Sequence, residues 1–496
     1  MSAPEPGPGG APEERPDADA RILGAGLYAP RARLPSAAVA DAWGRSAARG
    51  VESVAVPAPD EDALTMAVAA AERALEAAGV DAASLSGLAF ATTTPPMAEE
   101  DLTPRLGDAL GVPADATTRY AGRSTRAGTR ALRAARDAGA FPAVVVAADA
   151  PGGAPNSPEG HAAGAGAAAV VLGADRGSGA GLHGDSEVAT DYPGTRFRRP
   201  ASDEVEGLGV TTYDRAAFTR PVAAAVDGLA SDPDVPDPGD AAAVAISAPD
   251  GDLPGRAARA AGLDPGRVTT PVSTLGDTGA AGPLLGVARA LQEGATRTLV
   301  VGWGSGAGAD ALLVDGLAPV EGSLDAGDDV GYTDALRLRG DLTADEAPAG
   351  GGAAVSVATW RRSIAARYRL RAGRCPACGA LAFPPEGACP DCHALVDFDS
   401  VALPREGRVE TVTGVSPGGA PPEFARQAER GGDYPVAIVA FERDGGRVSL
   451  PMQVCDATPG SVAAADTVRA VFRRVYEQEG VVRYGRKARP VAVDER

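Results

Sequence analysis

The chain has 496 residues, a formal net charge of −19 and five cysteines. A chain this acidic repels the phosphate backbone, which argues against broad nucleic-acid binding, and no apolar run reaches the roughly 18 residues of a membrane span. Four of the cysteines stand in metal-binding spacing, and with no signal-peptide pattern this favours a reducing, cytoplasmic location.

The first half of the chain alternates between strand and helix patterns after a polar start. Residues 1–19 are rich in Pro, Gly, Ala and acidic residues, which predicts a disordered leader. Apolar residues at helical spacing predict helices, and continuous apolar runs are typical of strands covered on both faces. We expect a short strand leading into a turn at 21–30, strands at 86–92, 143–147 and 167–172, and helices at 62–78 and 128–139.

The second half repeats this scheme. We expect strands at 241–246 and 298–302, and helices at 254–261 and 282–293. Two Gly/Ala-rich segments, Ala163–Ala169 and Gly304–Asp310, stand in corresponding places, and each leads into a strand. An internal duplication of an α/β unit is the simplest account.

The composition changes again after about residue 341. Residues 341–356 are rich in Asp, Glu, Ala, Gly and Pro, which predicts a linker or mobile loop. Short strand patterns follow at 407–415, 434–442, 446–454 and 467–475, and their Gly/Pro turns predict a small closed barrel. The expected domain map is a leader at 1–19, an α/β domain at 20–345, a linker at 346–358, a cysteine-bearing segment at 359–400 and a barrel domain at 401–496.

Several motifs in the α/β domain carry a resemblance to a known family. They are Gly24–Pro30 with Asp41–Gly44, Pro59–Met66, Ala127–Leu132 and the glycine-rich Gly302–Asp310. The domain is similar to the thiolase superfamily; within it, it resembles the archaeal-type hydroxymethylglutaryl-CoA synthase family and is also akin to ketoacyl-ACP synthase III. The resemblance implies a five-layered αβαβα fold with internal duplication, and a homodimer.

The reactive residues of that family are replaced at the matching positions of this chain. The family uses a cysteine thiolate before an Ala-Gly-Thr helix start, where the helix dipole lowers the thiol pKa, together with a histidine and a glutamate. Thr125 stands at the cysteine position and Ser247 at the histidine position. Asp277 replaces an asparagine, and Thr94 is the best match to the glutamate.

Two functions stay open for this domain. Losing nucleophile and base together removes on the order of 10⁶ in rate, which favours a degenerate fold that still holds acyl-CoA. The alternative is an active acyltransferase or condensing enzyme with a non-cysteine mechanism, in which Thr125 needs a strong neighbouring base. Among the three histidines, His161 alone lies in the right region, and we expect it to be a packed side chain, whereas His183 and His393 offer little.

The cysteines at the start of the C-terminal part have the spacing C-x2-C-x10-C-x2-C. This spacing predicts one structural, tetrahedral zinc ion per chain. The four ligands are Cys375, Cys378, Cys389 and Cys392. His393 directly follows a ligand and is expected to be a bystander, and Cys455 is expected in the barrel core.

Residues 359–490 are similar to a second family, in which a rubredoxin-like zinc ribbon is joined to an OB-fold. The motifs that carry the resemblance are Tyr368–Gly379, Phe383–Pro385, Pro435–Val439 and Tyr484–Pro490. The resemblance implies an acyl-CoA-binding accessory domain that docks beside thiolase and hydroxymethylglutaryl-CoA synthase subunits.

Two groups of residues are candidates for binding CoA. The first belongs to an arginine-rich stretch at 360–374, and the second to the glycine-rich loop. They are Arg369 and Arg371, and Gly304, Ser305 and Gly306. The arginines would also suit a nucleic-acid backbone or a plain solvated helix face, but aromatic residues for base stacking are sparse. The combined prediction is a catalytically degenerate, acyl-CoA-binding scaffold or partner in lipid or isoprenoid-precursor metabolism, with a thiolase or an active synthase chain as a candidate partner.

Overall fold

The computed structural model describes residues 20–174, 177–342, 357–478 and 481–491. The leader predicted at 1–19 and residues 346–356 of the predicted linker lie outside the described residues. Residues 357 and 358, at the end of that linker prediction, begin helix α11 (Val357–Arg369).

The first half of the chain contributes five strands to the large sheet, in the spatial order β5-β4-β6-β7-β1. Their bounds are β1 Arg21–Tyr28, β4 Gly87–Thr92, β5 Thr117–Gly122, β6 Ala143–Asp149 and β7 Gly166–Gly173. β4 runs parallel to β5 and β6, whereas β7 runs antiparallel to β6 and β1. The four strands predicted in this half are confirmed, and β5 was not predicted.

The second half mirrors that order as β10-β9-β11-β12-β8. Its strands are β8 Ala180–Val188, β9 Ala243–Ile246, β10 Val268–Thr269, β11 Arg297–Gly304 and β12 Gly308–Asp315. The parallel and antiparallel pairings repeat as well, and the halves join where β1 pairs with β8. The predicted internal duplication is therefore confirmed.

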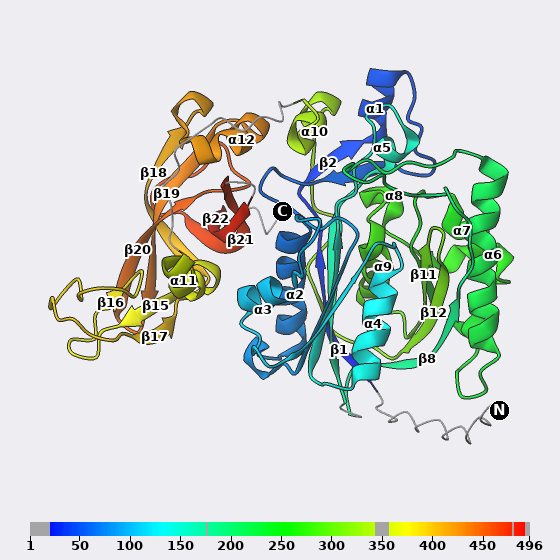
Figure 1. Ribbon diagram of the computed structural model, residues 1–496, viewed down its shortest axis with the longest axis horizontal. Coiled ribbons are helices and arrows are strands. Elements are labelled where there is room, and N and C mark those ends of the chain that lie inside the picture. The colour runs from blue at the N-terminus through cyan, green and yellow to red at the C-terminus, as the bar shows by residue number, and fades with distance from the viewer. Residues whose placement is uncertain (1–19, 175–176, 343–356, 479–480, 492–496) are drawn as a thin grey trace, which may run out of the picture.

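Helices separate and cover the two half-sheets, as Figure 1 shows from left to right. Helices α2 and α3 cover the outer face of the first half-sheet, α4 and α9 lie between the half-sheets, and α6 and α7 cover the second. The bounds are α2 Ala63–Ala78, α3 Thr103–Leu110, α4 Ala127–Ala138, α6 Thr211–Ala230, α7 Leu253–Ala260 and α9 Gly282–Gln292. The result is the predicted five-layered αβαβα architecture.

Both faces of the β6 strand are covered by helices, which explains its unbroken apolar run. Val144 and Val146 pack in the apolar cluster with α2, whereas Val145 packs in the central cluster with α4. Helix α2 comes so close to β1 that a Cβ on Gly26 would clash with the backbone of Ala70 and Ala74. Small residues thus set the layer spacing in this part of the fold.

The C-terminal part begins with α11 and a three-stranded sheet, and continues as a five-stranded barrel. The sheet consists of β15 Arg371–Arg374, β16 Leu381–Ala382 and β17 Asp399–Ala402. The barrel strands, in the order β20-β19-β18-β21-β22, are β18 Glu406–Val415, β19 Tyr434–Arg443, β20 Gly446–Gln453, β21 Thr467–Gln478 and β22 Val481–Pro490. A parallel bridge between Val454 and Ala488 brings the end of β20 against β22 and nearly closes the predicted OB-type barrel.

The barrel lies against the outer helix α2 of the α/β domain, and α11 lies against α3 (Figure 1). Phe472 and Tyr484 of the barrel and Tyr368 of α11 share one apolar cluster with α2. Buried polar contacts join the same surfaces: Lys487 to Asp60 at 2.9 Å, Arg473 to Glu61 at 3.1 Å, the Tyr484 hydroxyl to Asp62 at 2.7 Å, and Arg486 to Glu72 at 2.8 Å. The junction therefore combines apolar packing with paired charges.

Within the described residues, no helix combines the length and the apolar character needed to cross a bilayer. The longest helix in the described part of the chain is α6, and its 20 residues include charged side chains.

Candidate functional site

The four positions assigned to the family's reactive set lie at the ends of four different elements. Thr94 follows β4, Thr125 precedes α4 and Ser247 follows β9. Asp277 follows the short helix α8 (Val272–Leu275). Thr125 and Ser247 share the neighbour Trp303 in β11. Thr94 is linked through Asp149 to Ala280, in the segment between Asp277 and α9.

Thr125 and Ser247 contact the backbone of one residue, Trp303. The Thr125 hydroxyl donates to the Trp303 carbonyl at 2.6 Å, and the Trp303 amide donates to the Ser247 hydroxyl at 3.1 Å. Thr125 is buried, and its hydroxyl makes no hydrogen bond to a carboxylate or an imidazole within the described part of the chain. The hydroxyl proton is therefore held by a carbonyl, which cannot act as a base.

A buried carboxylate, Asp149 at the end of β6, organises the Thr94 position. It accepts hydrogen bonds from the hydroxyls of Thr92, Thr93 and Thr94, and from the amides of Thr93, Thr94 and Ala280, at 2.6 to 2.9 Å. The Thr94 hydroxyl donates to Asp149 and accepts from the Ala150 amide at 2.9 Å. A carboxylate with six donors is fully engaged in fixing the loop after β4, and Thr94 has no free proton to give.

The segment Tyr192–Arg198, here called the cover segment, crosses these positions. Arg196 donates from Nε to Asp277 at 2.9 Å and places Nη2 2.7 Å from the same oxygen. Its amide donates to the Ser305 hydroxyl at 2.8 Å, and Arg198 donates to the Thr93 carbonyl. Arg196 thus neutralises Asp277, and the segment is tied to three of the surrounding loops.

The residues predicted to bind CoA fall into two separate places. Gly304, Ser305 and Gly306 form the turn between β11 and β12 beside Thr125, and a Cβ on Gly304 would clash with Ser124 and Arg126.

Arg369 and Arg371 lie instead at the end of α11 and in β15, in the C-terminal part. Arg369 donates to the Asp108 carbonyl at 2.9 Å, and Arg371 donates to the Ser400 hydroxyl at 3.0 Å and to its carbonyl at 3.2 Å. The structure does not bring these arginines to the glycine turn, and Arg371 is bonded within the ribbon.

The four predicted metal ligands come together at the outer end of the C-terminal part. Their Sγ atoms all lie within 4.8 Å of one another, with 3.7 Å between Cys375 and Cys392 and 3.6 Å between Cys378 and Cys389. A tetrahedral ZnS₄ centre with Zn–S bonds of about 2.3 Å requires S···S separations of about 3.8 Å, so these cysteines fit zinc.

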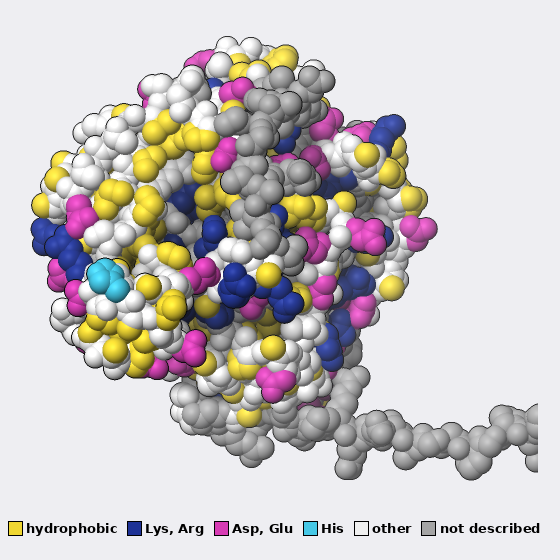
Figure 2. Space-filling view, turned by 60° about the vertical axis from the view of Figure 1, so that its left-hand side comes forward, with side chains coloured by type: hydrophobic (Ala, Val, Ile, Leu, Met, Phe, Trp, Pro, Cys, Tyr) yellow, Lys and Arg dark blue, Asp and Glu magenta, His cyan; other side chains and the backbone are white. Residues whose placement is uncertain are grey.

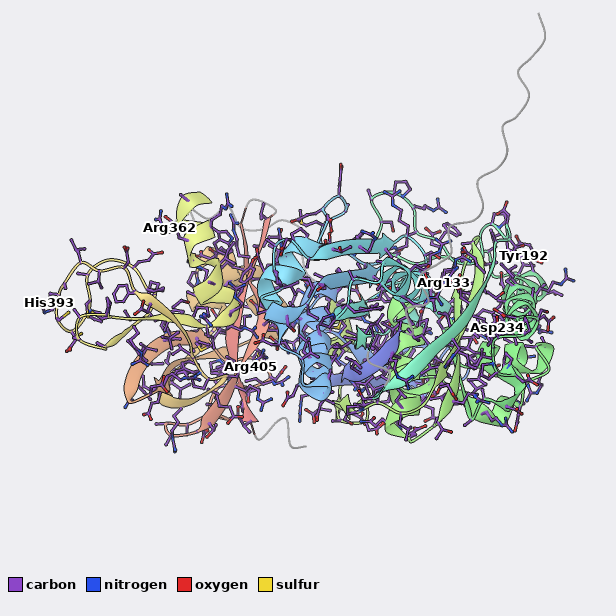
Figure 3. The ribbon with its side chains drawn as sticks, turned by 90° about the horizontal axis from the view of Figure 1, so that it is seen from below. Arg133, Tyr192, Asp234, Arg362, His393 and Arg405 are labelled. Atoms are coloured by element: carbon purple, nitrogen blue, oxygen red, sulfur yellow. The ribbon has the colours of Figure 1, made fainter. Side chains whose placement is uncertain are left out.

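Two similar backbone turns hold the cysteines in place. The Gly379 amide donates to the Cys375 carbonyl at 2.8 Å, and the His393 amide donates to the Cys389 carbonyl at 3.0 Å. His393 is exposed and lies at the opposite end of the molecule from Tyr192, as Figure 3 shows. Its ring is not part of the cysteine cluster, in line with its expected role as a bystander.

The remaining residues considered from the sequence are packed. His161 is buried, its Nδ1 accepts from the Ala47 amide at 3.0 Å, and burial lowers its pKa, so the ring is neutral at pH 7. It faces Trp43 rather than Thr125. The Cys455 thiol is buried, as predicted, but it lies just beyond the end of β20, beside the Ala488 carbonyl, and not within a barrel strand.

Asp149 and Arg196 are site residues that sequence reasoning missed. Asp149 had a signal, because it ends the apolar run of β6, and β6 is parallel to β4, so their carboxyl ends meet at one edge. Arg196 had none, because it lies in a polar loop 81 positions before its partner Asp277.

Comparison with known proteins finds similarity over both parts of the chain. A hydroxymethylglutaryl-CoA synthase of Methanopyrus kandleri is 31% identical over 304 residues, which are 59% of this chain and 86% of that protein. A DUF35 domain-containing scaffold protein of Methanocaldococcus jannaschii is 36% identical over 137 residues, 27% of this chain and 90% of that protein. Residues 362–398 match the family of the ChsH2 rubredoxin-like zinc ribbon domain.

Solved structures share the fold at lower identity. A hydroxymethylglutaryl-CoA synthase complexed with CoA superposes with a TM-score of 0.58 at 16% identity and covers 68% of this chain and 94% of that one. A 3-oxoacyl-(acyl carrier protein) synthase III of Pseudomonas aeruginosa gives 0.53 at 21% identity over 61% of this chain and all of that one. The thiolase-like fold and the metal-binding zinc ribbon are therefore joined in one chain.

Proposed function

The chain belongs to the hydroxymethylglutaryl-CoA synthase family, and from this premise we propose that it binds acyl-CoA without forming a covalent acyl-enzyme. It acts as a scaffold or partner in acyl-CoA metabolism, in the supply of isoprenoid precursors or lipids. The observation that carries the proposal is the hydrogen bond from the Thr125 hydroxyl to the Trp303 carbonyl, since it leaves the nucleophile position without a base.

Covalent acyl transfer needs a nucleophile that can lose its proton. A threonine hydroxyl has a pKa far above that of a thiol and requires an adjacent base to attack a thioester. The neighbouring polar groups are already used, because Arg196 pairs with Asp277 and Asp149 is saturated by donors. Losses of this kind typically remove on the order of 10⁶ in rate.

The C-terminal part supplies a function that needs no nucleophile. The DUF35 relative is named a scaffold protein, and this chain aligns with 90% of its length. By analogy, the ribbon and barrel of this chain would hold a thiolase or an active synthase chain next to the synthase-like domain. A homodimer would present this arrangement twice. We propose that the protein acts in the cytoplasm, because thiolate ligands stay reduced there.

Zinc would be held by Cys375, Cys378, Cys389 and Cys392, with all four positions filled by thiolates. A closed four-thiolate centre leaves no position for a substrate, so its contribution is to stabilise the ribbon. No step of the proposed function passes through it.

The proposal is tested by incubating the protein with labelled acetyl-CoA and measuring the intact mass. We expect no added acetyl group, together with saturable binding of acetyl-CoA in a calorimetric titration. An adduct of one acetyl mass that disappears in Thr125→Ala would instead establish the alternative, an acyltransferase with a threonine nucleophile.

A further inference from the structure

The outer surface of α11 carries arginines that the site around Thr125 does not use. The guanidinium carbon of Arg367 lies 4.8 Å from the centroid of the Trp360 ring, and that of Arg483, in β22, lies 4.7 Å from it. We call Trp360, Arg367 and Arg483 the Trp360 clamp. A single aromatic ring thus contacts two cations that come from different elements.

The arginines of the clamp differ from their neighbours in what they pair with. Arg105 and Arg486 pair with Glu100 at 2.5 Å and with Glu72 at 2.8 Å. Arg367 donates only from Nε to the Ser363 hydroxyl at 2.9 Å, and neither clamp arginine has a carboxylate partner within the described residues. The Nε of Arg483 is buried and unpartnered among those residues.

Positive charge extends beyond the clamp along the same helix. Arg361 and Arg362 are exposed on α11, and Figure 3 shows Arg362 on its outer side. On the face that Figure 2 displays, basic side chains gather near the middle of the molecule between apolar areas. A basic surface on a chain of net charge −19 is a local exception. It concentrates anions where the overall charge would repel them.

We propose that the Trp360 clamp is a binding site for a nucleotide phosphate ester. Guanidinium groups bind phosphate oxygens in a bidentate manner, and stacking on Trp360 fixes both forks before the ligand arrives, which lowers the entropy lost on binding. Two such groups around one ring suit a diphosphate or two neighbouring phosphates. The choice of ligand rests on the proposed function: it is the phosphoadenosine diphosphate end of CoA.

The position of the clamp predicts how the ligand is recognised. The clamp belongs to α11 and β22, whereas Thr125 and the cover segment belong to the α/β domain. Phosphates held at the clamp are therefore recognised without reference to the acyl group. CoA, acetyl-CoA and adenosine 3′,5′-bisphosphate should bind with similar affinity, and S-acetylpantetheine, which has no phosphate, should not bind.

The test is calorimetry on the full, zinc-loaded chain with these four compounds and a single-stranded 12-nucleotide DNA. Arg367→Gln and Arg483→Gln should each weaken binding of the bisphosphate about tenfold, the usual effect of losing one charge-assisted pair. Arg443→Gln, which removes an exposed arginine at the end of β19, should leave it unchanged. Zinc content and melting temperature establish that each variant is folded; should Arg483→Gln fail this check, the exposed Arg367 decides.

Each outcome has a distinct meaning. Unchanged bisphosphate binding in Arg367→Gln and Arg483→Gln overturns the clamp but leaves the proposed function standing if acetyl-CoA still binds. Clamp-dependent binding of the DNA without any binding of CoA supports the phosphate site and overturns the proposed function. A wild-type chain that binds none of the phosphate compounds overturns the clamp.

Discussion

Lys487, the only lysine of the chain, donates a hydrogen bond to Asp60 at 2.9 Å across the junction between barrel and α/β domain. Both side chains are buried. Burial acts to raise the pKa of Asp60, but the charges of Lys487 and Arg473 outweigh it and hold that pKa below its usual value. Burial lowers the pKa of Lys487. The contact is a buried ion pair that fixes the barrel in place.

Breaking this pair should destabilise the protein more than removing it whole. Lys487→Met leaves the Asp60 carboxylate buried without its partner, which we expect to lower the free energy of unfolding by about 3–5 kcal/mol. The double variant Lys487→Met/Asp60→Leu should recover most of that loss. Urea denaturation measures both, with the exposed Arg443→Met as control; a single variant within 1 kcal/mol of wild type would contradict the prediction.

Glu72 should make the domain junction sensitive to acid. Burial acts to raise its pKa, but Arg486 and Arg405 outweigh it and lower the pKa to about 2. The pKa of Glu72 is lower in the folded state than in the unfolded state. Its ionised carboxylate therefore stabilises the fold fully above about pH 4.5, and this contribution is lost as the pH falls towards 2. The lost contribution to the free energy of unfolding is about 3 kcal/mol.

The measurement is the stability difference between wild type and Glu72→Gln as a function of pH. It should be constant from pH 7 to about 5 and shrink below 4.5. A difference that does not change down to pH 3.5 would show that the ionised Glu72 contributes nothing.

Two cysteine substitutions should differ sharply in their effect on the amount of bound zinc. Cys375→Ser removes one of four thiolates and should reduce bound zinc well below one ion per chain and lower the melting temperature, because structural zinc contributes roughly 10–16 kcal/mol of apparent binding energy. Cys455→Ser, outside the cluster, should keep one zinc per chain. Elemental analysis decides; full zinc in Cys375→Ser would rule out the four-cysteine centre.

The cover segment should limit access to the position of the lost nucleophile. Residues 1–374 contain no cysteine, so Thr125→Cys places a single thiol there. We expect iodoacetamide to alkylate it slowly, and at least tenfold faster when Arg196→Ala removes the ion pair with Asp277, an effect of about 1.4 kcal/mol.

The matched control is Arg199→Ala, which removes an exposed arginine of the same loop that pairs with Glu206. Peptide mass mapping follows the modification at position 125. Equal rates in Thr125→Cys with and without Arg196→Ala would mean that the segment does not cover the site.

The strands that helices cover on both faces were predictable, whereas the edge strand β5 and the long helix α6 were not. The run 143–147 is apolar at every position because helices lie on both faces of β6. Strand β5 escaped prediction because its central residues, Arg119 and Tyr120, are exposed at the sheet edge. Helix α6 escaped because Pro221 lies inside it and interrupts the helical pattern.

The candidate site was also predictable only in part. Cysteine spacing alone located the metal centre, because ligands of a ribbon are close in sequence. Thr125 and Trp303 are 178 positions apart, and Arg196 and Asp277 are 81 apart, so their contacts depend on the duplicated fold rather than on local pattern. CoA binding by Arg371 was inferred from the arginine-rich stretch and stays a prediction. Its partner Ser400, in the neighbouring strand β17, could not be read from that stretch.

The single lysine also allows the contact between barrel and α/β domain to be followed chemically. An amine-directed reagent that modifies side chains can act only on Lys487, and that amine is shielded as long as the barrel stays docked on α2. The rate of Lys487 modification therefore measures how often the two domains part. Partner proteins or ligands that loosen or tighten the junction can be ranked by this rate, without a label being introduced.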